Sequence, residues 1–214
     1  MKRRFFILTL LKALALAACA PFTPGAFFHT AESDITLPAF EKLRQDCRPP
    51  ALLKPTPPAV IPANLQIDQS TGLHMTGTVQ YIDPAAYQLR VTGKVDHPLN
   101  LQLDELRCLP RVTAKTTLTC KGNFEDYATY SGVSLRLILN LAGVQIGARA
   151  VNLVGADGYT SYLALKDAFA PDNFLAYEWK GEPLPILNGF PLRSVIPAQL
   201  GDRWAKWLLA ITVE

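Results

Sequence analysis

The stretch of this 214-residue chain that is richest in chemistry is "LTCKGNF", from Leu118 to Phe124. Its cysteine, Cys120, ends a short run of β-branched and apolar residues, and charged and turn-forming residues follow at once. A thiol in this place can fill a core, form a disulfide or bind a metal. The local sequence leaves these three roles open.

The other cysteines narrow the possible roles of Cys120 only in part. The chain also has Cys19, Cys47 and Cys108. Without Cys19, which lies in an export signal described below, three cysteines remain, so at least one of them has no internal disulfide partner in an oxidising compartment. Pairing Cys47 with Cys108 would leave Cys120 free, but this is one of three pairings. A Cys108–Cys120 disulfide in a purely structural exported β-domain is another.

Basic residues near the C-terminus suggest a second kind of chemistry. Arg193, Arg203 and Lys206 occur close to Trp204 and Trp207 in a region rich in Gly and Pro. Arginine and lysine in loops suit an anionic phosphate, and arginine can bind it through two parallel hydrogen bonds. The alternative is a solvated face beside a tryptophan core, and we expect Trp207 to belong to that core.

Several common sites have no local support. The chain has no GxSxG elbow, no phosphate-binding P-loop and no GxGxxG motif, and its three histidines lack HExxH or CxxC companions. His97 stands before Pro98 in a predicted turn, so we interpret it as structural. Zinc and nucleotide sites are therefore not predicted.

The elements that must position these residues are mostly strands. Tyr87, Leu89 and Val91 alternate with polar residues, which is typical of a half-buried strand. Similar β-branched and apolar runs predict further strands at 116–120, 150–154, 161–165, 192–196 and 207–213. One clear helix is predicted from Leu135 to Ala142, with Ser134 as its N-cap and Gly143 at its end. Short helical turns are expected at 104–108 and 166–169. The fold class is α+β, predominantly β, with several short strands and a few short helices.

The N-terminus predicts export. A positive "MKRR" segment precedes the apolar "FFILTLLKALALAA", so residues 1–19 are interpreted as a signal peptide. Leu16 to Cys19 fits a bacterial lipobox, with ordinary cleavage near Ala18 or Ala20 as the alternative. Arg3-Arg4 resembles a twin-arginine signal, with general export as the alternative. The apolar run is short for a membrane span and Lys12 interrupts it. We therefore expect a protein of the periplasm or cell envelope, whose only membrane attachment, if the lipobox is used, is a lipid on Cys19.

Charge and proline content describe the rest of the chain. The formal charge is +3, but the part after residue 19 has 17 basic and 18 acidic residues, which gives no support for a nucleic-acid partner. Residues 20–75 are rich in proline and are predicted to be a tether, and residues 76–214 are predicted to be one domain.

Read together, the segments of this domain resemble the molybdopterin-binding domain of the sulfite oxidase family, in its small stand-alone form. The landmarks occur in family order: "YQLRVTGKVDHPLNLQLDELRCLP", "LTC", "YSGVSLRLILNLAGV", "GADGYTSYLALKDAF", "LAYEWKGEPLPILNGFPLRSVIP" and "GDRWAKWLLAITVE". The resemblance begins near Tyr87 and continues to the C-terminus. Any one landmark is weak, but six in the right order are specific, with a strand-ending cysteine ahead of "SGVSLRLIL" and "GEPLP…NGFPLR…P…KW" behind it.

The resemblance implies a cofactor and a site. It implies that Cys120 gives its thiolate to molybdenum, whose other sulfur ligands come from the dithiolene of one molybdopterin, and that the cofactor carries out a two-electron oxygen-atom transfer. It implies Arg193, Lys206 and Arg203 as anchors of the pterin phosphate, and Asn188, Gly189 and Asp157 as further lining. Asp126, Tyr127 and Tyr159 are candidates for the rim. The expected substrate is of the sulfite or sulfoxide type, and electrons would pass to or from a cytochrome or a quinone-linked protein.

Two departures from the family keep a different function open. Asn188 stands where the family usually has histidine, and Tyr130 stands where it usually has tryptophan. The alternative hypothesis is a cofactor-free envelope lipoprotein that uses the same fold to bind a protein or a small ligand.

Overall fold

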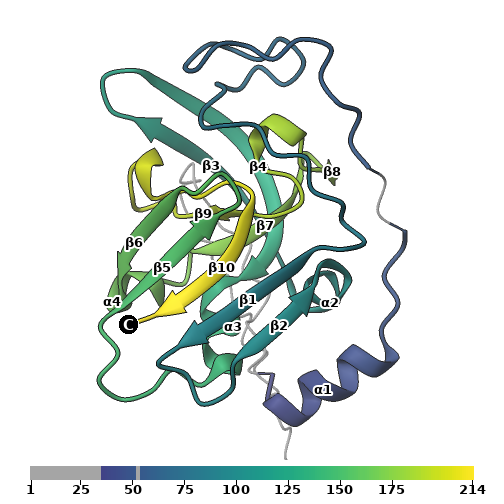
Figure 1. Ribbon diagram of the computed structural model, residues 1–214, viewed down its shortest axis with the longest axis vertical. Helices are drawn as coiled ribbons and strands as arrows, with labels where there is room; N and C mark the ends of the chain where they lie inside the picture. Colours follow the sequence, from purple (N-terminus) through teal and green to yellow (C-terminus); the bar gives the residue numbers. More distant parts are fainter. Residues whose placement is uncertain (1–34, 52–53) are drawn as a thin grey trace, which may run out of the picture.

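The computed structural model describes residues 35–51 and 54–214, so the predicted signal peptide lies outside the described residues (Figure 1). Two five-stranded sheets make up most of the domain. The first contains, in spatial order, β2 (Leu99–Gln102), β1 (Gln88–Gly93), β10 (Leu208–Val213), β5 (Ala150–Gly155) and β6 (Thr160–Ala164). Strand β1 is parallel to β10, and the other neighbours in this sheet are antiparallel.

The second sheet is antiparallel throughout. It contains β3 (Arg111–Cys120), β4 (Phe124–Ser134), β7 (Phe174–Trp179) and β8 (Glu182–Pro183), with β9 (Arg193–Val195) also paired to β7. The helical elements are α1 (Leu37–Asp46), α2 (Leu103–Cys108), α3 (Leu135–Ala142), α4 (Leu165–Ala168), and the 3₁₀ turns η1 (Ile186–Asn188) and η2 (Gly201–Arg203). The predicted α+β class, predominantly β, is confirmed.

The core lies where the two sheets and α3 meet. Leu89 and Val91 of β1 are completely buried while Gln88 and Arg90 are exposed, as the alternation predicts. The same continuous cluster includes Leu153 of β5 and Leu175 of β7, so both sheets contribute to one apolar core. Burial of each large aliphatic side chain contributes roughly 1.5–3 kcal/mol, which makes this cluster the main source of stability.

Helix α3 is the predicted helix, and its predicted caps are present. The Ser134 hydroxyl accepts a hydrogen bond from the Leu137 N–H at 3.3 Å, and Gly143 adopts φ 66° at the C-cap. Leu135, Ile138, Leu139 and Ala142 are buried on one face of the helix. Leu137 and Leu141 are buried too, so the helix is enclosed on most sides. Because α3 follows β4 directly, its burial also holds β4 in place.

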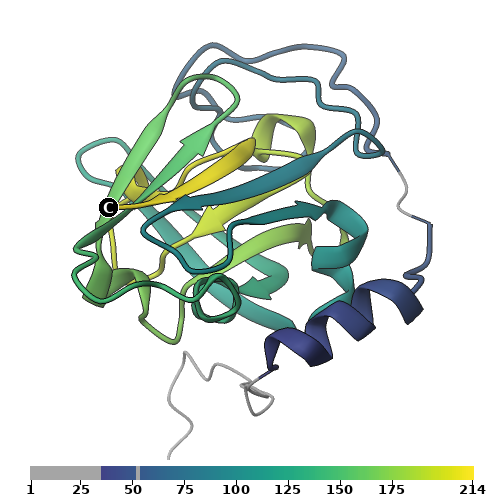
Figure 2. The same cartoon turned by 60° about the horizontal axis from the view of Figure 1, so that its bottom comes forward.

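Part of the segment predicted as a tether contains a helix that the sequence did not predict. Helix α1 begins with Pro38 in its first turn and buries Phe40 in the main core. A disulfide between Cys47 and Cys108 joins the end of α1 to α2, and Arg44 forms a 2.7 Å ion pair with Glu105. Figure 2 shows α1 lying along one side of the domain next to α2.

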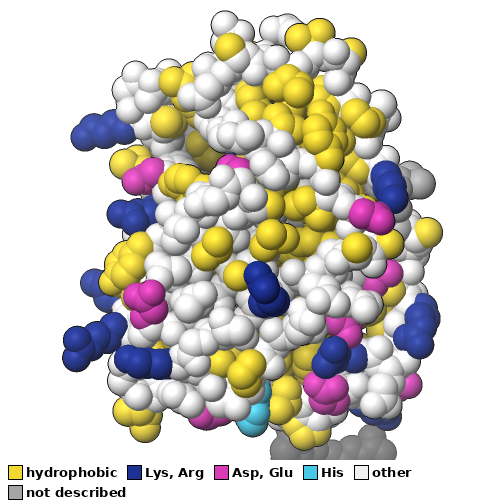
Figure 3. All heavy atoms as spheres, viewed as in Figure 1, with side chains coloured by type: hydrophobic (Ala, Val, Ile, Leu, Met, Phe, Trp, Pro, Cys, Tyr) yellow, Lys and Arg dark blue, Asp and Glu magenta, His cyan; other side chains and the backbone are white. Residues whose placement is uncertain are grey.

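The chain then crosses the domain before entering β1. Leu73 and Met75 are buried, and His74 forms a β-bridge with Ile67. In the face drawn in Figure 3, hydrophobic side chains gather in the upper half and charged side chains occur mainly at the margins. Within residues 35–51 and 54–214, no helix combines the length and the apolar composition needed to cross a membrane.

Candidate functional site

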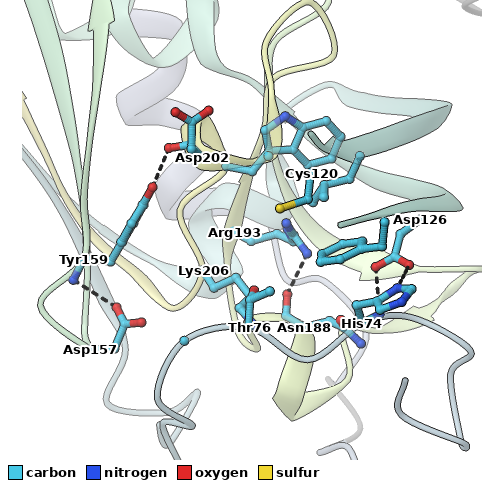
Figure 4. Close-up of a pocket in the computed structure, with 15 residues that line it drawn as sticks. His74, Thr76, Cys120, Asp126, Asp157, Tyr159, Asn188, Arg193, Asp202 and Lys206 are labelled. Carbon is cyan, nitrogen blue, oxygen red and sulfur yellow. Dashed lines mark hydrogen bonds and ion pairs between the residues drawn. The ribbon is translucent and has the colours of Figure 1, made fainter. Parts of the chain in front are cut away.

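A pocket of about 200 Å³ lies where the ends of several strands and loops converge (Figure 4). It combines a thiol, two basic side chains, three carboxylates and several apolar walls. Its lining consists of His74, Thr76, Gly77, Leu118, Cys120, Phe124, Asp126, Asp157, Tyr159, Asn188, Arg193, Gly201, Asp202, Trp204 and Lys206. The structure therefore brings together Cys120, Arg193, Lys206, Asn188 and Asp157 from the predicted site.

Cys120 reaches the pocket because it is the last residue of β3. It pairs with Phe124 across a tight β3–β4 turn in which Gly122 adopts φ 79°, a conformation that favours glycine. The thiol is half-buried and is the one free cysteine in the described part of the chain. The Asn123 amide lies 3.6 Å from its sulfur as a hydrogen-bond donor. Cys120 is thus available to a ligand in the pocket.

Arg193 is a buried cation held between two aromatic rings. Its guanidinium carbon lies 5.4 Å from the ring centroid of Tyr130 and 5.6 Å from that of Trp204. Nη1 donates to the backbone carbonyl of Asn188 at 3.1 Å. Tyr130, which departs from the family pattern, therefore packs directly on the predicted anchor, and burial raises the pKa of its phenol.

Lys206 is the second buried cation. Its Nζ donates to the Leu187 carbonyl at 2.8 Å and lies 4.5 Å from the centroid of the Trp207 ring. Burial, together with the neighbouring charge of Arg193, lowers the pKa of Lys206 to about 7, although Asp157 and Asp126 act in the opposite direction. In the described part of the chain neither Lys206 nor Arg193 forms an ion pair. Two buried basic side chains without a direct ion pair are costly to charge, and a bound anion would offset that cost.

Asn188 lines the pocket beside these cations, and Gly189 lies directly behind it against Arg193 and Lys206. Asn188 is buried, and its side-chain Nδ2 has no hydrogen-bond partner in the described residues. Gly189 adopts φ 107°, and a Cβ there would lie 3.1 Å from the Cβ atoms of both Arg193 and Lys206. The free amide donor, the two cations and the absence of a side chain at 189 together suit an anionic group with oxygen acceptors.

A second wall comes from the β5–β6 turn and η2. Asp157 accepts a hydrogen bond from the Tyr159 N–H at 3.1 Å, and the Tyr159 hydroxyl donates to the Asp202 carbonyl at 2.5 Å. Gly77 approaches this wall closely, since a Cβ there would lie 2.8 Å from Asp157 Oδ2. Figure 4 shows this group on the side of the pocket opposite His74 and Asp126.

The sequence did not identify His74 as a site residue. His74 donates its backbone N–H to Asp126 Oδ2 at 2.8 Å, and its Nδ1 lies 2.6 Å from Oδ1. Its ring also stacks on Phe124, with centroids 4.0 Å apart. The two residues are 52 positions apart, so only the fold brings them together. The glycines around "GLHMTG" indicate a turn but no chemistry.

Of the residues predicted for the site and its rim, Arg203, Gly189 and Tyr127 are not among the lining residues of the pocket. Arg203 donates Nη1 to the Tyr162 carbonyl at 2.8 Å, and its Nε lies 3.8 Å from Asp202. Tyr127 is exposed and lies under Lys115. Trp207 is fully buried and donates Nε1 to the Ile186 carbonyl at 2.9 Å, which confirms its predicted core role.

One pocket between the two sheets is thus lined by a free thiol, two buried basic side chains without an ion pair in the described residues, and an amide without a hydrogen-bond partner there. Residues 76–214 match the family model described as the oxidoreductase molybdopterin binding domain. The chain belongs to this family.

Relatives of known name agree with that assignment. The chain is 35% identical to the uncharacterized oxidoreductase YuiH of Bacillus subtilis, over 71% of this chain and 77% of that protein. It is 31% identical to a putative protein-methionine-sulfoxide reductase subunit of Azospira oryzae, over 63% of this chain and 52% of the relative. It is also 31% identical to Arabidopsis thaliana sulfite oxidase, over 60% of this chain and 42% of that enzyme. The chain thus matches about half or less of these two relatives.

A solved structure has the same fold. The sulfane dehydrogenase SoxCD of Paracoccus pantotrophus superimposes with a TM-score of 0.60 over 65% of this chain and 40% of the other, at 24% identity. This similarity supports the sulfite-oxidase-type architecture.

Proposed function

We propose that this protein is an exported molybdenum-cofactor oxidoreductase that transfers an oxygen atom, with two electrons, to or from a small sulfite- or sulfoxide-type substrate. The family membership supports the class of cofactor. The observation that carries the proposal is the position of two buried basic side chains, Arg193 and Lys206, which form no ion pair within the described residues, in the same pocket as the free thiol of Cys120.

The residues present fit such a cofactor. Cys120 would supply a thiolate to the metal, because a soft ligand suits molybdenum and binding favours the deprotonated form. Arg193 and Lys206 would hold the anionic end of the pterin, and Asn188 Nδ2 would donate a hydrogen bond to it. Gly189 and Asp157 would line its path. When bound, the molybdenum centre would supply the oxygen-atom transfer and the change in oxidation state.

The protein's own contribution is to position the groups that bind the anion and to exclude water from the pocket. Tyr130 and Trp204 fix the plane of the Arg193 guanidinium, so its N–H groups are preorganised for an anion. Leu118, Phe124 and Trp204 limit water in the pocket. The imidazole of His74, held by Asp126, can move a proton to or from an oxygen that enters or leaves.

Asn188 also bears on the cofactor-free alternative. A buried amide that fills a closed pocket would be expected to find a partner within the protein. Instead its Nδ2 has no partner among the described residues, and Asn188 is one of the residues that line the pocket. We therefore favour the cofactor-binding function over the envelope lipoprotein without cofactor.

The remaining parts of the proposal concern location and partners. The N-terminal sequence supports export to the periplasm or cell envelope, with a lipid anchor on Cys19. The Cys47–Cys108 disulfide is of a kind that persists in oxidising compartments. Electrons would pass to or from an external cytochrome or quinone-linked protein.

Turnover by the loaded protein tests the proposal. The full chain, produced in a host that makes molybdopterin, should reduce sulfoxides with a reduced viologen dye or oxidise sulfite with ferricyanide. The Cys120→Ser variant should lose this activity by at least about 100-fold, as expected when a group that acts directly in the chemistry is removed. A molybdenum-loaded wild type that is inactive in both directions would refute the proposed reaction.

A further inference from the structure

The 3₁₀ turn η2 connects the two sheets beside the pocket. A Cβ at Gly201 would lie 2.8 Å from Leu118 Cδ2, so η2 packs closely on β3 near its last residue, Cys120. On its other side, η2 is hydrogen-bonded to β6, the outermost strand of the first sheet. The turn therefore bridges the strand that carries the free thiol and the edge of the other sheet.

Three side-chain hydrogen bonds hold η2 against β6 and the residue that precedes this strand. Arg203 Nη1 donates to the Tyr162 carbonyl at 2.8 Å, and the Ser161 hydroxyl donates to the Arg203 carbonyl at 2.9 Å. The Tyr159 hydroxyl donates to the Asp202 carbonyl, as the dashed line in Figure 4 shows. Arg203 is thus engaged with β6 and is not among the residues that line the pocket.

The position of Trp204 depends on η2, because Trp204 follows the turn directly. Its backbone N–H donates to the Gly201 carbonyl at 3.1 Å, and its Nε1 donates to the Ile196 carbonyl at 2.8 Å. The buried ring lies 5.6 Å from the guanidinium carbon of Arg193 and packs edge-on against Tyr130, with the ring centroids 6.4 Å apart. A displacement of η2 would therefore move one of the two rings between which Arg193 is held.

We propose that Arg203 is a positioning residue for Arg193 and does not itself bind the phosphate of the cofactor. This inference rests on the proposed function, in which Arg193 holds the anionic end of the pterin. Arg203 fixes η2 on β6, η2 fixes Trp204, and Trp204 keeps the guanidinium of Arg193 in the plane that an anion requires. The competing role is the one that the resemblance implies, in which the charge of Arg203 binds the phosphate directly.

Ser161 separates these two roles. Its side chain carries no charge, is 1% exposed and is not among the pocket lining, so it can affect cofactor binding only through η2. If Arg203 acts through η2, Ser161→Ala should have the same kind of effect as Arg203→Met. If Arg203 is an anchor, Ser161→Ala should have none. Tyr162→Phe is the matched control, because it keeps the backbone carbonyl to which Arg203 donates.

The first measurement monitors Trp204 directly in cofactor-free protein. In ¹⁵N-labelled protein the indole N–H signals are assigned by single Trp→Phe changes. We expect Arg203→Met and Ser161→Ala to shift the Trp204 signal. The Trp207 signal should stay in place, because its Nε1 donates to the Ile186 carbonyl at 2.9 Å, away from η2. Tyr162→Phe should move neither signal.

The second measurement is the molybdenum and pterin content of protein purified from a host that makes the cofactor. Arg203→Met and Ser161→Ala should each lower it by about 3-fold, which is in the range expected for the loss of one ordinary hydrogen bond. Tyr162→Phe should retain the wild-type content. This readout does not depend on the identity of the substrate or on turnover.

The outcomes distinguish this inference from the proposed function. Loss of cofactor in Arg203→Met with full retention in Ser161→Ala would show that Arg203 binds the phosphate, and would overturn the inference. An unchanged Trp204 signal in Arg203→Met would overturn it too, as would Tyr162→Phe behaving like Arg203→Met, since a general weakening of β6 would then be the cause. Wild-type protein without molybdenum and pterin refutes the proposed function, and the inference falls with it.

Discussion

Both carboxylate oxygens of Asp126 are hydrogen-bonded to His74, one to its backbone N–H at 2.8 Å and one to its ring Nδ1 at 2.6 Å. This pair connects the segment before β1 to β4 at the edge of the pocket. It therefore couples the position of the N-terminal part of the domain to the shape of the site.

Removing the carboxylate should cost stability through this coupling. Asp126→Ala is expected to lower the free energy of unfolding by about 1–3 kcal/mol, because two partly buried donors of His74 lose their acceptor. In a double-mutant cycle with His74→Ala, the coupling free energy should be about 0.5–3 kcal/mol, measured by urea unfolding. Asp104→Ala, which breaks the exposed ion pair with Arg107, should cost less than about 1 kcal/mol. Additive effects of the His74 and Asp126 changes would contradict the coupling.

Lys206 should make the stability of the cofactor-free protein depend on pH. Burial lowers its pKa to about 7 in the folded protein from 10.5. Between these values the unfolded chain binds a proton that the folded chain does not, so stability should rise with pH through this window and be lost as pH falls towards 7. The slope is at most about 1.4 kcal/mol per pH unit.

Urea unfolding of wild type and Lys206→Met at several pH values from about 6 to about 10 measures the contribution of Lys206 to the pH dependence of the free energy of unfolding. The methionine variant retains the other titrating groups, so the difference between the two curves isolates Lys206. Parallel curves would show that Lys206 has an ordinary pKa.

The two arginines should contribute differently to cofactor retention. Arg193 is buried in the pocket, whereas Arg203 donates to a backbone carbonyl outside its lining. Arg193→Met should reduce the molybdenum content of purified protein about 10-fold or more, in line with the loss of a charge-assisted hydrogen bond of about 1.5–3 kcal/mol. Arg203→Met should have the smaller effect. An equal loss in both would mean that Arg203 is also an anchor, as the resemblance implied.

The disulfide should stabilise the domain through its long loop. Cys47 and Cys108 are 61 positions apart, for which the chain-entropy relation gives about 4 kcal/mol. Replacing both by serine should lower the free energy of unfolding by roughly 2–4 kcal/mol in urea. Dithiothreitol should have a similar effect on wild type and none on the double variant. A double variant as stable as wild type would show that α1 is held by Phe40 and the Arg44–Glu105 pair alone.

Local patterns predicted the elements whose residues obey simple periodicity. The β1 strand was predicted from the alternation at Leu89 and Val91, and the ends of α3 were predicted from Ser134 and Gly143. Each of these signals depends only on residues close together in the sequence, and both predictions were confirmed. Strand β4 was not predicted, although it is the longest strand in the described residues. Seven of its last eight positions are buried or half-buried, so its sequence does not alternate between apolar and polar residues.

The site was predictable only where residues carry a family motif. Cys120, Arg193 and Lys206 stand in such motifs and meet in one pocket. His74 is not part of such a motif. Its partner Asp126 is 52 residues away, and the two meet only after β4 has folded against the segment that contains His74. Helix α1 was hidden for a similar reason, since it is stabilised by Phe40 packing in a distant core and by the disulfide.

The most direct test of the central claim is X-ray absorption at the molybdenum edge, on wild type and on Cys120→Ser. If Cys120 is a ligand in a molybdopterin site, wild-type protein should contain molybdenum bound by dithiolene sulfurs and one further sulfur. The serine variant should then have one sulfur ligand fewer or lose the metal. Wild-type protein without molybdenum, or an unchanged number of sulfur ligands in the variant, would contradict the claim.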